Sequence, residues 1–418
     1  MSGTRRILAE RAGCDKLKPG EFVEMPVDLV LANDITGPLA IKEFGRLSAG
    51  RVFDRSKVVL VLDHFTPNRD IASAEQCARV RRFAREQEIE SFYDGGDVGI
   101  EHVLLPEEGL IKPGTVVVGA DSHTCTYGAL GCFATGMGST DIGAAMATGK
   151  VWLRVPEAIQ VILSGKFNRW VGGKDVILSL IGRLHVDGAT YRSLEFTGGG
   201  LEDLSVEGRL TVANMAVEAG GKNALFGVDQ PTVAYLASAH VTAEAKDILP
   251  DEWGYSGEVE MDLRELAPQV ALPSLPSNVV GVTDAPHVKL DQVVIGSCTN
   301  GRLEDMRIAA EVLSGKKAAP GVRLLIVPGS KRVYRASMEE GLFDVFLDAN
   351  AVISPPTCGP CLGGHMGVLA AGEKALSTTN RNFVGRMGHR ESEVYLCNPA
   401  VAAASAVTGT ITEPGEIM

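Results

Sequence analysis

The chain has 418 residues, of which 45% are hydrophobic and 22% charged, a composition typical of globular proteins and not of disordered or fibrous ones. Its length exceeds what one hydrophobic core supports, so we expect two or three domains. The formal net charge of −12 repels polyanions, which argues against nucleic acid as the main partner. An anionic substrate would need a local group of arginines.

The sequence shows no segment that indicates export or membrane insertion. Residues 1–13 carry charges at short intervals and lack the apolar core of a secretory signal. No run approaches the roughly eighteen apolar residues of a membrane-spanning helix. We therefore expect a cytoplasmic protein without a membrane partner, whose eight cysteines stay reduced and can bind metal.

Short apolar runs rich in β-branched residues predict buried parallel strands, each followed by a polar or glycine-rich turn. These runs are residues 27–38, 57–68, 114–124, 291–301 and 322–330. Helical stretches are predicted between them at residues 72–86, 305–313 and 335–341. The alternation predicts the α/β class, in which ligands bind beyond the carboxyl ends of strands.

Two boundaries divide the chain. Residues 266–286 contain four prolines and no charge before Asp284, which predicts an extended connector. A second boundary is placed near Pro156, at the end of a glycine-rich segment, 128–154, that we expect to be helical. The predicted domains are residues 1–156, 157–275 and 276–418.

Three cysteines form the sharpest motif. Cys358 and Cys361 have C-x-x-C spacing, and Cys298 lies sixty residues earlier, in a loop after a predicted strand. Such thiolates can reach one metal centre, and three ligands on a four-iron cluster leave one iron open. An open metal position is typical of a catalytic site.

Closed metal sites remain an alternative to this interpretation. A thioredoxin-like dithiol would open a helix near the first strands, whereas this C-x-x-C lies far along the chain. Cys397 follows a predicted strand and could complete a four-cysteine zinc or iron–sulfur site. That site would be saturated, and the protein would then be structural or an electron carrier.

Histidines beside acidic residues form a second group. Asp63 precedes His64, Asp121 lies two residues before His123, and His102 follows a polar loop. A histidine that protonates a departing hydroxide needs a carboxylate to orient it and to hold its pKa up. The histidines without such neighbours are interpreted as structural: His185, His240, His287, His365 and His389.

Arg381 and Arg386 supply the local basic group that an anionic substrate requires. Guanidinium groups pair with carboxylates through two parallel hydrogen bonds. A solvated basic loop is the alternative interpretation of this pair.

Five motifs together resemble the large subunits of the aconitase superfamily, most closely those of the isopropylmalate dehydratases with their homoaconitase and dimethylmalate dehydratase relatives. The motifs are DHFTPN, GADSHTCTYGALG, GSCTNG, TCGPCLGG and NRNFVGR. The resemblance runs from about Asp28 to Thr412 in the family's order. It implies three α/β domains around one central [4Fe–4S] cluster, with the mobile swivel domain absent from this chain.

The resemblance also implies roles for individual residues. The cluster ligands are Cys298, Cys358 and Cys361, with Asn300 and Asn380 as hydrogen-bonding neighbours. The acid–base and hydrogen-bonding positions are Asp63, His64, His102, Asp121, Ser122 and His123, while Asn214 and Glu218 contact the iron-bound water. Arg381 and Arg386 bind substrate carboxylates, and Asn33 stands where many isopropylmalate enzymes have histidine.

The function implied is that of a hydro-lyase large subunit that interconverts 2-isopropylmalate and 3-isopropylmalate in leucine biosynthesis. The swivel domain with its serine base is then a separate small subunit. Homoaconitase and 2,3-dimethylmalate dehydratase large subunits are alternatives of the same class. An RNA-binding regulator formed on loss of the cluster is disfavoured by the net negative charge.

Overall fold

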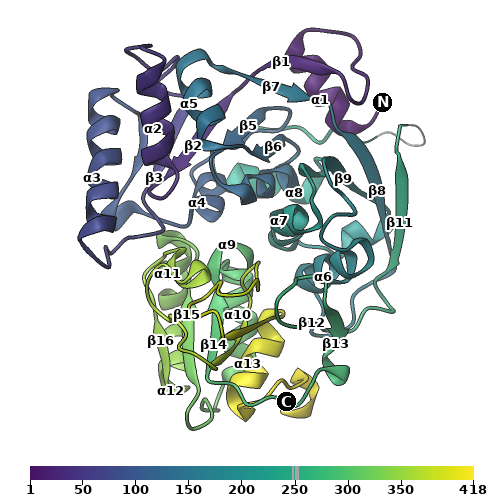
Figure 1. Cartoon of the computed structure of the whole chain (residues 1–418). Helices are drawn as coiled ribbons and strands as arrows, with labels where there is room; N and C mark the ends of the chain where they lie inside the picture. Colours follow the sequence, from purple (N-terminus) through teal and green to yellow (C-terminus); the bar gives the residue numbers. More distant parts are fainter. Residues whose placement is uncertain (247–248, 250–253) are drawn as a thin grey trace. The chain divides into compact units, whose positions relative to one another are not determined.

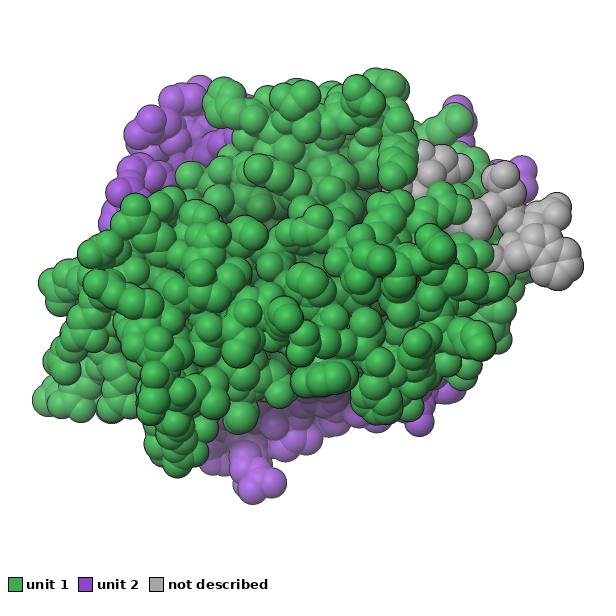
Figure 2. All heavy atoms as spheres, turned by 90° about the horizontal axis from the view of Figure 1, so that it is seen from above, with its two compact units in different colours: residues 1–95, 105–165, 189–262 green, residues 96–104, 166–188, 263–418 purple. Residues whose placement is uncertain are grey.

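The computed structural model describes residues 1–246, 249 and 254–418. They form two compact units, coloured separately in Figure 2. Unit 1 comprises residues 1–95, 105–165 and 189–262, and unit 2 comprises residues 96–104, 166–188 and 263–418. Each unit therefore draws on three separate stretches of the chain.

Unit 1 contains a five-stranded parallel sheet in the order β4-β3-β2-β5-β6. Its central strands are buried on both faces, as continuous Val and Leu runs predict for a parallel sheet. Helices α2 and α5 pack against β2 and against each other (Figure 1). The bounds are β2 (Leu29–Asn33), β3 (Val58–Val61), β4 (Ser91–Tyr93), β5 (Val116–Gly119), β6 (Phe133–Gly136), α2 (Gly37–Arg46), α3 (Ile71–Glu86) and α5 (Ser139–Thr148).

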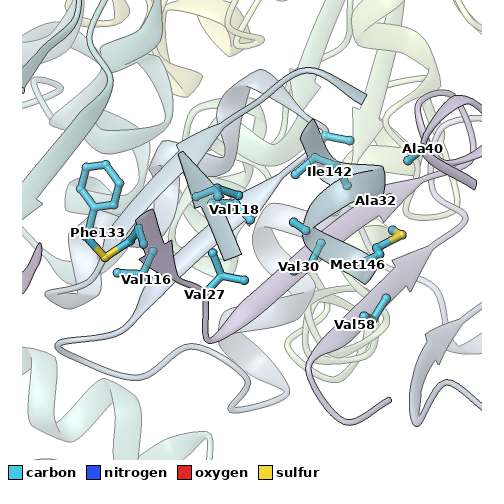
Figure 3. Close-up of a cluster of buried hydrophobic side chains, with 14 of the residues drawn as sticks. Val27, Val30, Ala32, Ala40, Val58, Val116, Val118, Phe133, Ile142 and Met146 are labelled. Carbon is cyan, nitrogen blue, oxygen red and sulfur yellow. The ribbon is translucent and has the colours of Figure 1, made fainter. Parts of the chain in front are cut away.

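The core of this sheet is apolar and closely packed. Figure 3 shows side chains from the strands, such as Val30 and Val118, with Ile142 and Met146 from α5. All four are at most 1% exposed. Burial on this scale fixes the strand register, and therefore fixes which residues follow each strand at the sheet edge.

Helix α3 starts at a capping box that its sequence encodes. The Asp70 carboxylate accepts a hydrogen bond from the Ser73 backbone N–H (2.8 Å), and the Asp70 N–H donates to the Ser73 hydroxyl (3.2 Å). Cys77, Val80 and Phe83 then recur at helical spacing and are buried. The helix begins directly after the loop that carries Asp63 and His64.

A second sheet of unit 1 has four parallel strands in the order β10-β9-β8-β11. Phe196 of β9 and Phe226 of β10 stack with ring centroids 4.5 Å apart. A two-stranded antiparallel ribbon, β1-β7, completes the strands of the unit among the described residues. The bounds are β1 (Phe22–Pro26), β7 (Lys150–Arg154), β8 (Glu157–Ser164), β9 (Arg192–Thr197), β10 (Asn223–Phe226), β11 (Gly257–Asp262), α1 (Gly3–Ala12), α7 (Val206–Asn214) and α8 (Gln230–Ser238).

Unit 2 is built on a seven-stranded sheet in the order β13-β12-β18-β17-β14-β15-β16. The strands β18, β17, β14, β15 and β16 run parallel to one another, and β12 is antiparallel to its two neighbours, β13 and β18. Helices α10 and α13 pack against each other and against β14. The strands are β12 (Gln269–Ala271), β13 (Val279–Gly281), β14 (Gln292–Gly296), β15 (Arg323–Val327), β16 (Ala351–Ile353), β17 (Lys374–Ser377) and β18 (Glu393–Leu396).

The helices of unit 2 include one that is buried along most of its length. In α13 the Asn398 side-chain oxygen accepts from the Val401 N–H (2.9 Å) and Pro399 occupies the first turn. Its alanines let the helix lie close to the sheet. The α-helices are α6 (Gly173–Leu184), α9 (Ser297–Asn300), α10 (Leu303–Leu313), α11 (Lys331–Glu339), α12 (Leu342–Asp348) and α13 (Pro399–Thr408), and α4 (Glu101–Glu107) begins in this unit.

The five predicted strands and three predicted helices are present, but two other segments differ from expectation. Residues 128–154 are not one helical segment, because β6 and β7 flank α5 there. Residues 266–286 are not simply an extended connector, because β12 and β13 add two strands to the sheet of unit 2. The division into three domains stays a prediction. Within the described chain no helix combines the length and apolarity that crossing a bilayer requires.

Candidate active site

Unit 1 delivers three predicted site residues to the carboxyl edge of its five-stranded sheet. Asn33 is the last residue of β2, Asp63 follows the end of β3 by two positions, and Asp121 follows the end of β5 by two positions. Since β3, β2 and β5 are neighbours, these ends lie side by side. This is the edge where parallel α/β sheets bind ligands.

His64 is held between two carboxylates. Its Nδ1 lies 2.6 Å from Asp63 Oδ1 and 3.5 Å from Asp34 Oδ1, and all three residues are buried. Asp34 also accepts hydrogen bonds from the backbone N–H groups of His64 (3.0 Å) and Phe65 (2.7 Å). Burial favours the neutral ring, but the Asp63 and Asp34 carboxylates outweigh it and raise the pKa of His64 well above its ordinary value. The two carboxylates therefore favour the protonated form of His64.

His123 lies between two further carboxylates. Its Nε2 is 2.9 Å from Glu218 Oε1 and its Nδ1 is 3.4 Å from Asp121 Oδ1. Asp121 also accepts a hydrogen bond from the His123 backbone N–H (2.7 Å), which starts the 3₁₀ helix η2 (Ser122–Leu130). The two contacts orient the ring, and both His123 and Glu218 are buried.

The remaining predicted residues of unit 1 are Asn214, Ser122 and Asn33. Asn214, at the end of α7, donates to the Thr126 hydroxyl of η2 (2.9 Å), and Ser122 is the first residue of η2. Asn33 uses its amide oxygen in the turn before α2, where it accepts from the backbone N–H groups of Ile35 and Thr36, both at 3.0 Å. The roles of these residues toward a substrate stay predictions.

Unit 2 places Cys298 and Asn380 after two neighbouring strands, β14 and β17. A sharp turn at Gly296 (φ 134°) leads to Cys298, and an added Cβ there would lie 2.0 Å from the Val327 carbonyl oxygen, so only glycine fits. The Asn380 side chain contacts two cysteines: its Nδ2 donates to Cys298 Sγ and its Oδ1 accepts from Cys361 Sγ, both at 3.4 Å. One amide thus bridges two of the three predicted ligands.

The loop of Cys358 and Cys361 is supported from its own unit. Both cysteines are buried. The Thr357 hydroxyl lies 3.0 Å from His365 Nε2 and accepts from the Gly359 N–H at 3.2 Å. The structural role of His365 stays a prediction.

The two predicted substrate arginines lie in the segment after Asn380. Arg386 Nη2 donates to Cys361 Sγ at 3.6 Å, so one predicted carboxylate-binding group stands directly beside a predicted cluster ligand. Arg381 is partly buried. Its contact with substrate stays a prediction.

A buried arginine clamps the turn that carries Cys298. Arg302 is 2% exposed and donates from Nη1 to the carbonyl oxygens of Cys298 (3.0 Å) and Thr299 (3.1 Å). Its Nη2 donates to the carbonyl oxygen of His102 (3.3 Å), whose ring lies 3.6 Å from Glu101. The clamp therefore connects a predicted cluster ligand to a predicted acid–base residue.

Cys397 has different surroundings from the three predicted ligands Cys298, Cys358 and Cys361. It is fully buried in the hydrophobic core of unit 2, beside residues such as Val401 and Leu376. Burial raises the pKa of its thiol, which disfavours the thiolate that a metal needs. This argues against a fourth cysteine ligand and a closed site.

A model of the aconitase family (aconitate hydratase) matches residues 7–409. The chain belongs to the aconitase family. The family assignment confirms the resemblance predicted from the motifs.

Curated members of the aconitase family extend the match along the whole chain. The "3-isopropylmalate dehydratase large subunit" of Syntrophus aciditrophicus (strain SB) is 59% identical, over 100% of this chain and 99% of the relative. The proteins of the same name from Acetivibrio thermocellus and Moorella thermoacetica are 56% and 57% identical, and the alignments cover 100% of this chain with 100% and 99% of the relatives.

A solved structure shows the fold. Aconitase X of Thermococcus kodakaraensis (holo-form) matches with a TM-score of 0.50 and 15% identity over 91% of this chain and 89% of that chain. The predicted aconitase-like α/β fold is confirmed.

Several residues that contact the predicted site residues or their loops were not themselves predicted as site residues. They are Asp34 beside His64, Glu101 beside His102, the Arg302 clamp and the buried Lys174 of α6. Asp34 and Glu101 had a signal, since each adjoins a residue already singled out. Arg302 and Lys174 act through backbone carbonyls, for which the sequence contains no pattern.

Proposed function

We propose that this chain is the large, cluster-binding subunit of a hydro-lyase that interconverts 2-isopropylmalate and 3-isopropylmalate by dehydration and rehydration, a reaction of leucine biosynthesis. The observation that carries the proposal is the identity of 53–59% over the full chain to relatives named 3-isopropylmalate dehydratase large subunit. Homoaconitase and dimethylmalate dehydratase activities are the alternatives to be tested beside it.

The residues of unit 2 fit a [4Fe–4S] cluster with three protein ligands. Cys298, Cys358 and Cys361 are buried thiols, and the Asn380 amide touches two of the sulfurs. Within the described residues, the buried Asn300 Oδ1 has no hydrogen-bond partner, so it can accept from a donor such as a substrate hydroxyl or a water, but not from the cluster, whose sulfur atoms only accept. When bound, such a cluster supplies a Lewis-acid iron for the substrate hydroxyl.

Arginines of unit 2 are suited to bind the substrate. A hydroxy-dicarboxylate carries two anions, and guanidinium groups bind carboxylates in a bidentate manner. Arg386 is already placed beside Cys361, and Arg381 lies five residues before it. We propose that both orient the substrate carboxylates.

Histidines of unit 1 are suited to move protons. The Asp63 and Asp34 carboxylates raise the pKa of His64 and so favour its protonated form, which can donate to a departing hydroxyl. His123 Nε2 lies 2.9 Å from Glu218 Oε1, a distance at which a proton can pass between the two groups, so we propose that this pair takes part in rehydration. In unit 2, His102 with Glu101 is a further candidate proton carrier.

A partner subunit completes the proposed enzyme. The relatives are named as large subunits, which supports a separate small subunit as partner. We propose that it carries the swivel domain and the base that removes the C–H proton, and that the pair acts in the cytoplasm.

The test is turnover by the reconstituted pair. Protein with its cluster rebuilt without oxygen, mixed with the small subunit, is expected to convert 3-isopropylmalate to 2-isopropylmalate faster than it converts homocitrate-type or dimethylmalate substrates. The large subunit alone is expected to be inactive. If the pair turns over none of these diacids, the proposed function is wrong.

Cysteine variants test whether the site is open. Cys361→Ser is expected to lose iron and activity, whereas the matched Cys397→Ser is expected to keep both because Cys397 lies in the apolar core. Loss of iron in Cys397→Ser would instead favour a closed, non-catalytic site.

A further inference from the structure

Lys174 is a buried cation that no part of the proposed mechanism uses. It lies in the first turn of α6 and is 1% exposed. Its Nζ donates to the carbonyl oxygens of Thr378 (2.7 Å) and Thr379 (2.6 Å). No carboxylate in the described chain is in ion-pair contact with it. An ammonium group buried in this way is costly unless a counter-charge is present.

Both thiols and carboxylates surround Lys174. Burial lowers the pKa of Lys174 to about 8, and the ionised forms of Cys397, Cys361, Asp305 and Cys298 would raise it, in that order. Burial keeps the Cys397 thiol in its neutral form, and the Asp175 carboxylate also interacts with the ammonium. Cys361 and Cys298 are predicted cluster ligands, so their thiolates and the cluster that they would hold would add counter-charge to that of the carboxylates.

The two carbonyls that Lys174 binds belong to the turn that presents Asn380. Thr378 and Thr379 directly precede Asn380, whose amide contacts Cys298 and Cys361. The Thr378 hydroxyl accepts from the Gly296 N–H (2.8 Å) and donates to the Gly296 carbonyl (3.1 Å), just before Cys298. Lys174 therefore fixes the backbone at the junction of the strands that deliver Cys298 and Asn380.

We propose that Lys174 is a positioning residue for the cluster, whose ammonium both balances the charge of the thiolate-bound cluster and holds the Thr378–Asn380 turn against the cysteines. The inference rests on the proposed function, since it needs the cluster to be bound. Its charge should stabilise the reduced, more negative cluster relative to the oxidised one.

Three substitutions separate the charge from the hydrogen bonds. Lys174→Gln removes the charge and keeps an N–H donor, Lys174→Met removes both, and Lys174→Arg keeps the charge. Lys222→Met is the matched control, because Lys222 of unit 1 also donates to a carbonyl oxygen, that of Gly136 at 3.3 Å. The measurements on anaerobically reconstituted holoprotein are iron per chain, the reduction potential of the cluster followed by EPR, and the lifetime of the cluster in a chelator.

The expected results differ between the readouts. The reduction potential should shift to more negative values in Lys174→Gln and Lys174→Met, and stay near wild type in Lys174→Arg and Lys222→Met. The cluster lifetime should fall about tenfold or more in Lys174→Met and less in Lys174→Gln. A role limited to folding would lower the stability of the apo-protein and leave the potential of the bound cluster unchanged.

The outcomes also separate this inference from the proposed function. If wild type binds no cluster, the proposed function fails first. If wild type binds the cluster but Lys174→Gln keeps the wild-type potential and lifetime, the role of Lys174 is overturned and the proposed function stands. Should Lys174→Met not fold, the comparison of Lys174→Gln with wild type decides.

Discussion

Replacing Arg302 by methionine should destabilise the protein and release the turn that carries Cys298. Methionine fills much of the same volume but donates no hydrogen bond. The carbonyl oxygens of Cys298, Thr299 and His102 would each lose a donor that now lies 3.0–3.3 Å away.

The expected size of this effect follows from the burial of the clamp. Arg302 is 2% exposed, so water does not readily replace the lost donors. Leaving one buried acceptor unsatisfied costs about 1–3 kcal/mol, and such costs are not fully additive. We therefore expect a loss of about 3–5 kcal/mol in the free energy of unfolding.

Urea-induced unfolding of the apo-protein, followed by circular dichroism, measures this loss, and hydrogen exchange of the peptide that contains Cys298 locates it. Arg307→Met is the matched control, five residues further along in α10, because Arg307 is exposed and pairs with Glu340 at the surface. It should unfold close to wild type. Equal urea midpoints for the Arg302 and Arg307 variants would refute the reasoning.

Three further predictions concern unit 1. His64→Gln should lower the free energy of unfolding most at pH below about 6.5, because folding favours the charged ring of His64. The difference in unfolding free energy between wild type and variant should shrink as the pH rises through the raised pKa of His64. A difference that does not change with pH in urea titrations would contradict this. Asp34→Asn should lower the pKa of His64 in an NMR titration, and an unchanged value would show that Asp63 alone sets it. Gly128→Ala should lower the free energy of unfolding, measured by thermal denaturation, by about 3 kcal/mol, because the added Cβ would collide with the Ala224 carbonyl oxygen. Gly45→Ala is the control, because Gly45 has open space around it, and its free energy of unfolding should not fall.

The parts of the fold that the sequence predicts are those encoded locally. Buried strands such as β3 and β14 are continuous apolar runs, and their last residues lead into Asp63 and Cys298. Strands β12 and β13 are three residues long and lie among prolines, so their sequence resembles a connector. They become strands because the edge of a larger sheet supplies their hydrogen-bond partners.

The candidate site follows the same division. The C-x-x-C pair and the Asp63–His64 neighbours are visible within a few residues. Glu218 was predicted only from the family resemblance. Arg302 was predicted neither from local motifs nor from the resemblance, because its hydrogen bond to the His102 carbonyl joins residues 200 positions apart. Contacts of this kind depend on packing, which no local pattern records.

The bond between His123 and Glu218 joins residues 95 positions apart. Closing so long a loop costs entropy that only the packed sheets of unit 1 can offset. A chain emerging from the ribosome therefore lacks this contact until residue 218 has been synthesised and the sheets of unit 1 have packed. For the proposed mechanism, this means that a partly made chain has His123 without its Glu218 partner.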